Sequence, residues 1–323
     1  MNRWLRYRIA DALITAIAAV IALIVLVRLL PGDPLTAILG DRGADPATRA
    51  MLEARWGTDR TLLQTLASFF GGVLHGDLGI SLSEQRPVTT VLAERLGPTL
   101  LLGSLTLLID FTVGLALGVW AALHPDTLRA RLLGFFTLIG YAVPSFVVGT
   151  LLMWIFAVKL GWVESGGLTD TLLASDAPAT AVLVDRLKHL ALPLAAMVVA
   201  TIAVPLRQQR TAALETAAQP WVLAAQARGV RPAAIAWRHC WRPALTPIVT
   251  LFGLWLPMLV AGAVFVEYVF NWPGMGSLLA HATFSRDFPL VIGAGLVLIA
   301  FVQLGSLLAD VLYHVVDPTQ RPS

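Results

Sequence analysis

Long uninterrupted apolar runs constrain this chain more than any other feature of its sequence. The first extends from about Ile9 to Leu30, and five more lie at about 98–123, 132–158, 189–206, 247–270 and 289–313. At about 1.5 Å per residue, each run is long enough as a helix to cross roughly 30 Å of hydrocarbon, although 189–206 is near the lower limit. The runs do not alternate as membrane strands do, and a helix satisfies its own backbone hydrogen bonds in lipid. The sequence therefore predicts an all-α polytopic membrane protein with six transmembrane helices.

Composition supports this class and argues against several kinds of site. Only 13% of the residues are charged, against about 25% in soluble domains. The net charge of +3 does not indicate nucleic-acid binding, because the arginines flank the apolar runs. Cys240 is the single cysteine, and the six histidines show no metal-binding spacing. We therefore expect no intrachain disulfide, no metal site and no nucleic-acid partner.

The chain also lacks the residues that would let it hydrolyse ATP. A phosphate-binding loop of the form GxxxxGK[ST] requires a lysine after glycine. Lys159 and Lys188 are the only lysines, and neither has the required neighbours. No serine, histidine and aspartate grouping indicates a nucleophile either. We expect no catalytic residues, no enzyme activity and no cofactor bound by this chain.

The distribution of basic residues predicts the orientation. Segments 1–8, 124–131, 207–246 and 314–323 together hold 12 Lys or Arg, whereas the short loops 159–188 and 271–288 hold four. Cytoplasmic segments carry this excess, and loops longer than about 60 residues hardly count. Both termini are therefore expected in the cytoplasm. The predicted organisation is a cytoplasmic N-terminus with the first span (1–30), an extracytoplasmic loop (31–97), a transmembrane core (98–313) with a cytoplasmic segment (207–246), and a cytoplasmic tail (314–323).

The long outer loop is expected to form an ordered cap between the first two spans. Asp45 is a candidate N-cap, Pro46 suits the first helical position, and Gly57 is a stop signal. The later stretch TLLQTLASFFGGVLHG is amphipathic and could lie along the membrane surface. Both patterns predict short helices in this loop.

A basic, hinged segment follows the fourth expected span. It reads AAQARGVRPAAIAWRHCWRPALTP over residues 224–247 and contains no acid. Pro220 can open a first helix that Gly229 ends in a left-handed cap, and Pro232 can open a second that runs to about Trp241. The arginines alone could simply fix the topology. A helix pair with alanines on one face instead favours a docking element for a cytoplasmic partner.

This segment resembles the EAA segment of inner-membrane permeases from binding-protein-dependent ABC importers, in the dipeptide, oligopeptide and nickel branch. Ala224, Ala225 and Gly229 match its alanine and glycine core. Four further stretches resemble motifs of the same family in the same order: RLLPGDP (28–34), GDLGISL (76–82), VEYVFNWPGMGSLLAHATFSRDFPLVIG (266–293) and DVLYHVVDP (310–318). The resemblance extends over nearly the whole chain, although Leu223 and Ser306 depart from residues common in the family.

The resemblance implies a function and a set of partners. The helix pair would be a coupling helix that docks into an ATPase subunit, through Ala224, Ala225, Arg228, Gly229, Val230, Ile235 and Arg238. It further implies a second permease subunit, two cytoplasmic ATPase subunits that hold ATP and Mg, an extracytoplasmic solute-binding protein, and a bacterial inner membrane. The expected cargo is di- or oligopeptides, with nickel chelates, glutathione and other small solutes as alternatives.

Two acids near or within the spans are candidates for the translocation pathway. Asp110 lies halfway along the second span, where a charge costs roughly 3 kcal/mol. Its side chain therefore either lines the pore or makes a structural hydrogen bond. It is also the residue on which a rival function would depend, that of an ATP-independent secondary transporter. Glu267 ends the fifth span and is either part of the outer mouth or a headgroup-level anchor. Four prolines in the spans permit kinks: Pro144, Pro193, Pro205 and Pro257.

Overall fold

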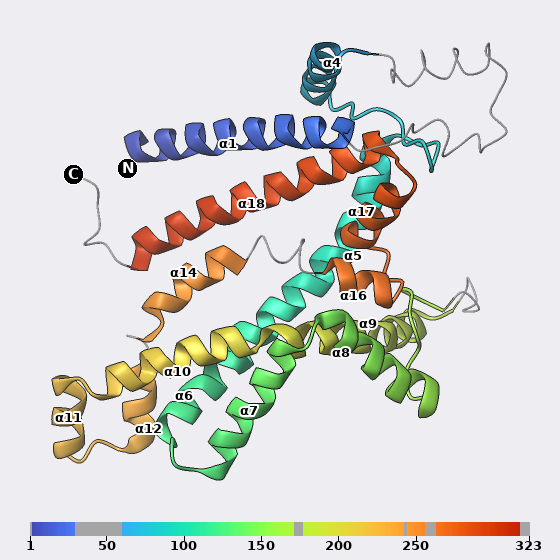
Figure 1. The fold of residues 1–323 in the computed structure, drawn as a ribbon. Coiled ribbons are helices and arrows are strands. Elements are labelled where there is room, and N and C mark those ends of the chain that lie inside the picture. The colour runs from blue at the N-terminus through green and yellow to red at the C-terminus, as the bar shows by residue number, and fades with distance from the viewer. Residues whose placement is uncertain (1, 30–59, 171–176, 242–243, 256–262, 317–323) are drawn as a thin grey trace. The chain divides into compact units, whose positions relative to one another are not determined.

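A computed structural model describes residues 2–29, 60–170, 177–241, 244–255 and 263–316 (Figure 1). Throughout these residues the regular structure is helical, with one isolated β-bridge between Ile80 and Pro87. The predicted all-α fold is confirmed. The helix expected at 45–57 lies outside the described residues. The chain forms two compact units, Met1–Thr99 with Pro273–Leu304 and Leu100–Trp272 with Gly305–Ser323.

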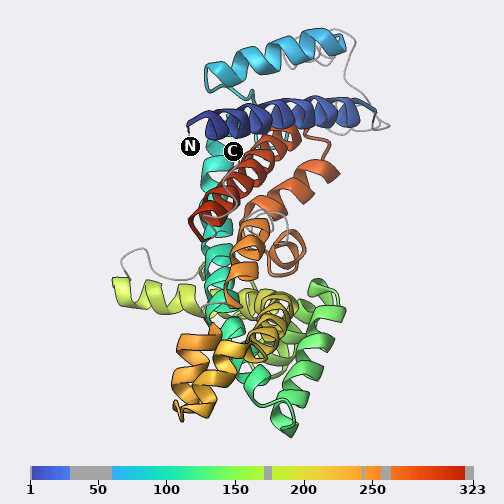
Figure 2. The same ribbon diagram turned by 90° about the vertical axis from the view of Figure 1, so that its left-hand side faces the viewer.

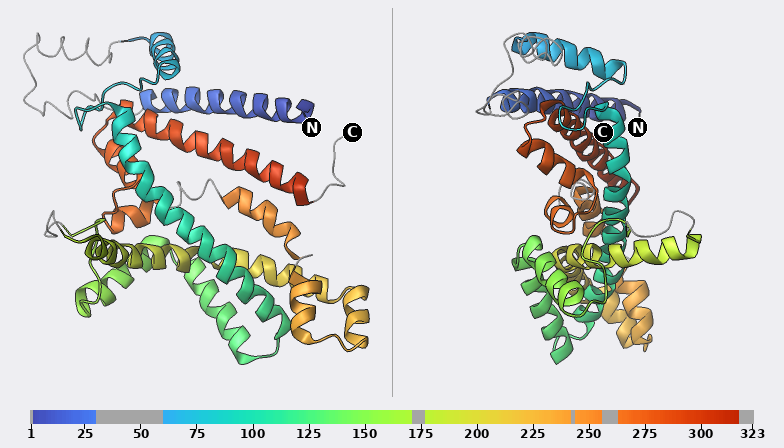
Figure 3. Two further views of the ribbon diagram at one scale, coloured as in Figure 1. Left: turned by 180° about the vertical axis from the view of Figure 1, so that it is seen from behind. Right: turned by 90° about the vertical axis from the view of Figure 1, so that its right-hand side faces the viewer.

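The first unit combines the N-terminal part of the chain with a later segment that includes the start of the last helix. Its helices are α1 (Asn2–Leu29), α4 (Leu62–Leu74), the start of α5 (Val88–Ile109), α17 (Met275–Phe284) and the start of α18 (Phe288–Val316). Figures 1 and 3 show α1 and α18 side by side. A Cβ atom on Gly295 would overlap the side chain of Leu23, so the glycine permits this close approach. The amphipathic stretch of the outer loop forms α4, with Thr61 and Gln64 in a reciprocal capping box.

Two of the family-like motifs meet in this unit at one buried carboxylate. The Oδ2 atom of Asp287 accepts hydrogen bonds from Ser81 Oγ at 2.6 Å, Ser83 N at 2.9 Å and Ser83 Oγ at 2.8 Å. Its Oδ1 atom accepts from Leu290 N at 3.1 Å, in the first turn of α18. The side chain of Asp287 is fully buried. Asp287 therefore fixes the loop before α5 to the start of the last helix.

The second unit holds most of the remaining helices. They are the rest of α5, η1 (Asp110–Gly114), α6 (Leu115–Leu123), α7 (Leu128–Ala142), α8 (Ser145–Leu152), η2 (Met153–Lys159), α9 (Ala179–Thr201), α10 (Ala203–Ala217), α11 (Pro220–Ala227), α12 (Pro232–Ala234), η3 (Ile235–Trp241), α14 (Thr246–Trp255) and α16 (Val264–Val269). One of its apolar clusters includes Leu102, Met197, Phe270 and Trp272. Gly167 N donates to Phe270 O at 2.9 Å, which ties the loop after η2 to this cluster.

Three expected spans are single helices long and apolar enough to cross a membrane: Arg6–Leu29, Val88–Leu123 and Phe288–Leu312. The run 132–158 is instead two helical pieces that meet at 104°. Val143 is extended between them because a residue before proline avoids helical geometry, and Pro144 follows it. The fifth span is only partly described, since 256–262 lies outside the described residues, so the count of six is not tested.

The run 189–206 also contains a bend. The helix begins earlier than expected, at Ala179, and α9 and α10 meet at 42° around Ile202. Pro205 has no N–H group to donate to the Thr201 carbonyl, which weakens the helix at this point. The helix then continues through Arg207 to Ala217. The segment expected to lie in the cytoplasm thus begins inside a helix.

A close seam joins α6 and α10. A Cβ atom on Gly114 would lie 3.1 Å from Ile202 Cγ1. One turn further, a Cβ atom on Gly118 would lie 2.5 Å from Leu206 O and 3.0 Å from Gln209 Cβ. The two glycines bring the helix backbones together at successive turns. The polypeptide that leads to the basic segment is therefore fixed directly against α6.

Candidate functional site

The basic segment begins with the short helix α11. Gln219 is extended and Pro220 occupies the first turn of the helix. At the other end Gly229 has φ +73°, and the predicted left-handed cap is confirmed. Val230 N donates to Ala225 O at 3.2 Å and Gly229 N donates to Gln226 O at 2.9 Å. These two bonds make a Schellman motif, which fixes where the chain turns.

The second helix starts at Pro232, three residues after the glycine. Ala234 N and Ile235 N both donate to Arg231 O, at 2.9 and 3.1 Å. The short helix α12 continues into η3, a π-helical stretch that ends at Trp241. The predicted end near Trp241 coincides with the edge of the described residues, since 242–243 lie outside them, so it stays a prediction. Figures 1 and 2 show the first helix beside the second at the end of α10.

A small core of its own holds the helix pair together. Val222, Ile235 and Cys240 are buried against one another, and Ala217 and Val230 pack on them. Burial raises the pKa of the Cys240 thiol, so it stays protonated and acts as an apolar packing group. The sequence did not reveal this role for Cys240. We call residues 220–241 the coupling pair from here on.

The structure divides the predicted docking residues into two groups. Ala225 and Ile235 are buried inside the coupling pair and Val230 is half-buried. Ala224, Arg228, Gly229 and Arg238 are exposed. The second group is accessible to another protein in this structure, whereas Ala225 and Ile235 are not.

Large apolar side chains accompany the accessible group. Trp221 and Leu223 are each 52% exposed and Trp237 is 65% exposed. Trp221 precedes Ala224 by three residues and Leu223 is adjacent to it, so they flank the exposed alanine on α11. Hydropathy alone assigns such residues to a core, which is why the sequence did not mark them as surface. Exposed aromatic and aliphatic side chains beside arginines are typical of a protein-binding surface.

Asp110 is fully buried at the start of the π-helical turn η1. Its Oδ2 atom accepts a hydrogen bond from Thr201 Oγ1 at 2.7 Å, and Oδ1 has no hydrogen-bond partner among the described residues. Thr201 Oγ1 also lies 2.7 Å from Met197 O. Thr201 is the last residue of α9, so Asp110 connects η1 to the bend between α9 and α10.

Glu267 is also fully buried, in α16. Trp272 N donates to the Glu267 carbonyl at 2.8 Å, and Trp272 and Phe270 are buried beside it in the apolar cluster. The structure does not bring Glu267 together with Asp110 or with the coupling pair.

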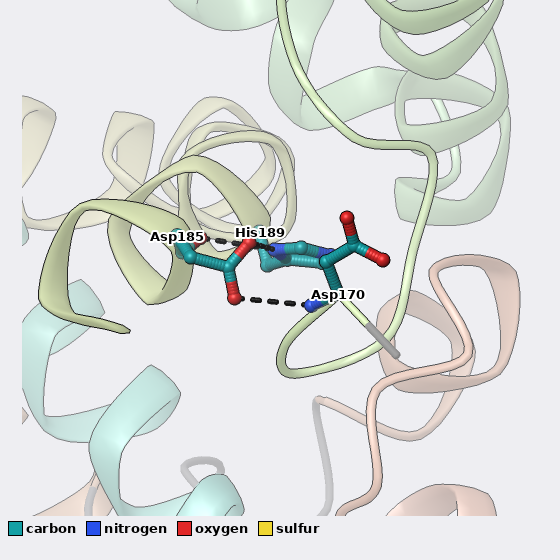
Figure 4. A network of polar contacts seen from close by, with 3 residues as sticks. All are labelled: Asp170, Asp185 and His189. Atoms are coloured by element: carbon teal, nitrogen blue, oxygen red, sulfur yellow. Dashed lines mark hydrogen bonds and ion pairs between the residues drawn. The ribbon is translucent and has the colours of Figure 1, made fainter. Parts of the chain in front are cut away.

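A polar network lies on the loop that was expected outside (Figure 4). Asp170 N donates to Asp185 Oδ2 at 3.0 Å, and His189 Nδ1 lies 3.3 Å from Asp185 Oδ1 and 2.9 Å from the Asp185 carbonyl. His189 is buried. The network fixes the loop before α9 to the first turns of that helix. In the described part of the chain, no three His, Cys, Asp or Glu side chains could hold a metal ion.

Comparison with known proteins identifies the family. A family described as "Binding-protein-dependent transport system inner membrane component" matches residues 114–322. A putative peptide permease protein of Brucella ovis is 36% identical, with 98% of both chains covered. The di/tripeptide transport system permease protein DppB of Pseudomonas aeruginosa is 34% identical, with 92% of both covered, and the dipeptide transport system permease protein DppB of Escherichia coli is 31% identical, with 99% of both covered.

A solved structure of the MetNI methionine ABC transporter in an inward-facing conformation shares the fold. The TM-score is 0.52 at 19% identity, and the match covers 70% of this chain and 96% of that chain. The apolar helices and the family together make this a multi-pass inner-membrane protein. The chain belongs to the family of inner-membrane components of binding-protein-dependent transport systems and is a permease subunit of an ABC importer.

Proposed function

We propose that this chain forms one half of the translocation pathway of an ATP-driven importer for di- or oligopeptides. A second permease subunit forms the other half, and two cytoplasmic ATPase subunits bind ATP and Mg. An extracytoplasmic solute-binding protein delivers the cargo. Both chain termini and the coupling pair face the cytoplasm, in keeping with the 12 basic residues on that side against four on the other short loops.

The observation that supports this role best is the form of the coupling pair. It is a rigid helical hairpin with a capped turn at Gly229 and its own core of Val222, Ile235 and Cys240. Its outer surface presents Trp221 and Leu223 beside exposed arginines. A loop that only fixed topology would need the arginines but neither the core nor the cap.

The packing of α10 gives the coupling pair a mechanical connection to the spans. Gly118 fixes α10 against α6, and Ala212 and Ala213 pack on Val119 and Ala122 further along the same seam. Well-packed interfaces transmit displacement instead of absorbing it. Closure of the ATPase subunits on ATP would therefore move the coupling pair and α10 as one body. That motion would open the pathway alternately to each side of the membrane.

Peptides are the proposed cargo because the relatives are named for them. The three relatives described above are named as peptide, di/tripeptide and dipeptide permeases. Nickel chelates and glutathione remain alternative cargoes. Secondary transport coupled to Asp110 is not favoured, because the family and the permease relatives all belong to ABC importers.

A pull-down with matched variants tests the docking role. We would purify the chain from native membranes in mild detergent and identify the proteins that accompany it. Leu223→Glu places a charge on the outer surface of α11, and Leu187→Glu makes the same change at a similar exposure, 54%, on α9. We expect Leu223→Glu to lose the ATPase subunits and keep the second permease, while Leu187→Glu keeps both. Equal loss in both variants, or retention in both, would exclude the coupling pair as the docking element.

A further inference from the structure

A shallow groove opens between α7 and α10 in the second unit. Its volume is about 360 Å³, within the range of roughly 300–1,000 Å³ that is usual for small-molecule sites. Six residues line it: Tyr141, Ala203, Val204, Arg207, Gln208 and Thr211. The proposed docking role uses none of these residues.

The groove exists because α10 has two different faces. Leu206, Gln209 and Ala213 are buried, and Leu206 and Gln209 meet Gly118 of α6. Arg207 and Thr211, four residues apart on one stripe of the helix, are exposed on the groove side. Arg207 and Thr211 directly follow the expected span 189–206, so this polar face lies at the cytoplasmic end of the span, where water and a polar ligand can reach it.

The lining has the chemistry of an anion site. Arg207 supplies a permanent positive charge and a planar set of donors that matches a carboxylate. Gln208 adds an amide donor, and Thr211 and Tyr141 add hydroxyl groups. No acid lines the groove. Among the described residues, none forms an ion pair or a side-chain hydrogen bond with Arg207.

The groove also lies where both bent helix pairs change direction. Tyr141 is at the end of α7, two residues before the break at Val143, and Ala203 directly follows the bend at Ile202. A Cβ atom on Gly140 would lie 2.7 Å from Val199 O, so α7 and α9 are in close contact beside the groove. A change in either bend angle therefore changes the spacing between Tyr141 and the polar stripe of α10.

We propose that this groove receives the terminal carboxylate of a peptide on its way through the permease, with Arg207 as the charged partner. The inference rests on the proposed function, since it names the part of the cargo that one segment of the pathway recognises. The exposed setting of Arg207 keeps the interaction weak, and a transport site must release its cargo. The bends at Val143 and Ile202 couple the affinity of the site to the conformation of the permease.

A paired-cargo transport assay tests this site. The complete importer, with its partner permease, ATPase subunits and binding protein, is reconstituted in liposomes with ATP on the ATPase side. Uptake of a tripeptide is compared with uptake of the same tripeptide carrying a C-terminal amide. The ratio of the two rates in Arg207→Gln is divided by the ratio in the parent. Because the parent and variant importers share the same binding protein, the preference of that protein for the acid or the amide cancels.

We expect the preference for the free acid to fall by about 1.5- to fivefold in Arg207→Gln, the range for an exposed ion pair. Arg207→Lys should retain most of the preference because it keeps the charge. Arg210→Gln is the matched control, since Arg210 is exposed on α10 but does not line the groove. Its ratio should equal that of the parent.

An unchanged ratio in Arg207→Gln would overturn the proposal. This includes an equal loss of acid and amide uptake, which is expected if Arg207 serves assembly or binds a lipid phosphate. If Arg207→Gln fails to assemble, the same ratio can be measured in Gln208→Leu and Thr211→Val. An unchanged ratio in both variants would refute the site. A parent importer that takes up neither peptide with ATP would instead refute the proposed function.

Discussion

The substitution Gly118→Ala tests whether the seam between α6 and α10 holds the second unit together. The new methyl group would lie 2.5 Å from the Leu206 carbonyl oxygen and 3.2 Å from Arg210 N. The first contact is inside the 3.0 Å limit that real Cβ atoms respect, and both partners are backbone atoms that cannot rotate away. The two helices must therefore move apart by at least half an ångström at this turn.

The expected loss of stability follows from two opposing terms. Overpacking of this kind costs about 1–3 kcal/mol, whereas replacing glycine by alanine within a helix gains about 0.5–1 kcal/mol. The net destabilisation is thus at most about 2.5 kcal/mol, a fall in Tm of up to roughly 10 °C for a unit of this size. Thermal unfolding of the detergent-solubilised chain, followed by tryptophan fluorescence, measures it.

A second glycine supplies a control of opposite sign. Gly134 lies in the middle of α7, is exposed, and has nothing within 4 Å of the position of a Cβ atom. Gly134→Ala should raise the Tm or leave it unchanged, because only the helix propensity changes. If Gly118→Ala proves as stable as Gly134→Ala, the seam is not a close contact and the mechanical connection through α10 is wrong.

Three further outcomes follow from individual buried groups. Gln209→Met should stabilise the chain by about 1–3 kcal/mol in the same unfolding assay. The reason is that both amide atoms of the fully buried Gln209 lack a hydrogen-bond partner among the described residues. A loss of stability would reveal a partner for the amide. Asp287→Ala should destabilise the first unit by about 2–5 kcal/mol, because it leaves the buried Ser81 hydroxyl and other donors without an acceptor. Protection of the amides of residues 81–99 against hydrogen exchange should then fall. Unchanged protection would show that Asp287 does not hold the loop before α5 in place. The raised pKa and the burial of Cys240 predict slow alkylation by a maleimide at pH 8, because less thiolate is present than for an ordinary thiol. Alkylation should become rapid once the coupling pair unfolds. Fast labelling of the native chain would show that the small core is open.

Local backbone chemistry could be predicted from the sequence. Gly229 adopts the left-handed cap and Pro232 opens the second helix, because these residue types determine the backbone within one or two positions. The long apolar helices also follow directly from composition. Pro144 was recognised as a possible kink, but its 104° angle is set by packing around it, which no local pattern contains.

Side-chain orientation and distant pairing could not be predicted. Ala224 and Ala225 are equivalent in type, so residue type alone does not indicate that one is exposed and the other buried. Ser81 and Asp287 are 206 residues apart, and their hydrogen bond depends on the fold of the whole first unit. Exposure of Trp221 was missed for a related reason, because hydropathy measures the tendency to leave water and not which surface receives the side chain.

The separate core of the coupling pair affects how the outer surface of the pair can evolve. Val222 and Cys240 stabilise the hairpin from inside, whereas Trp221, Leu223 and Arg228 contribute little to its folding. Substitutions at the outer positions can therefore accumulate without unfolding the segment. Under the proposed docking role, a cell with several importers of similar architecture could keep each permease subunit matched to its own ATPase by varying these few side chains. Duplicated transporters can diverge in this way while the scaffold that carries the surface stays the same.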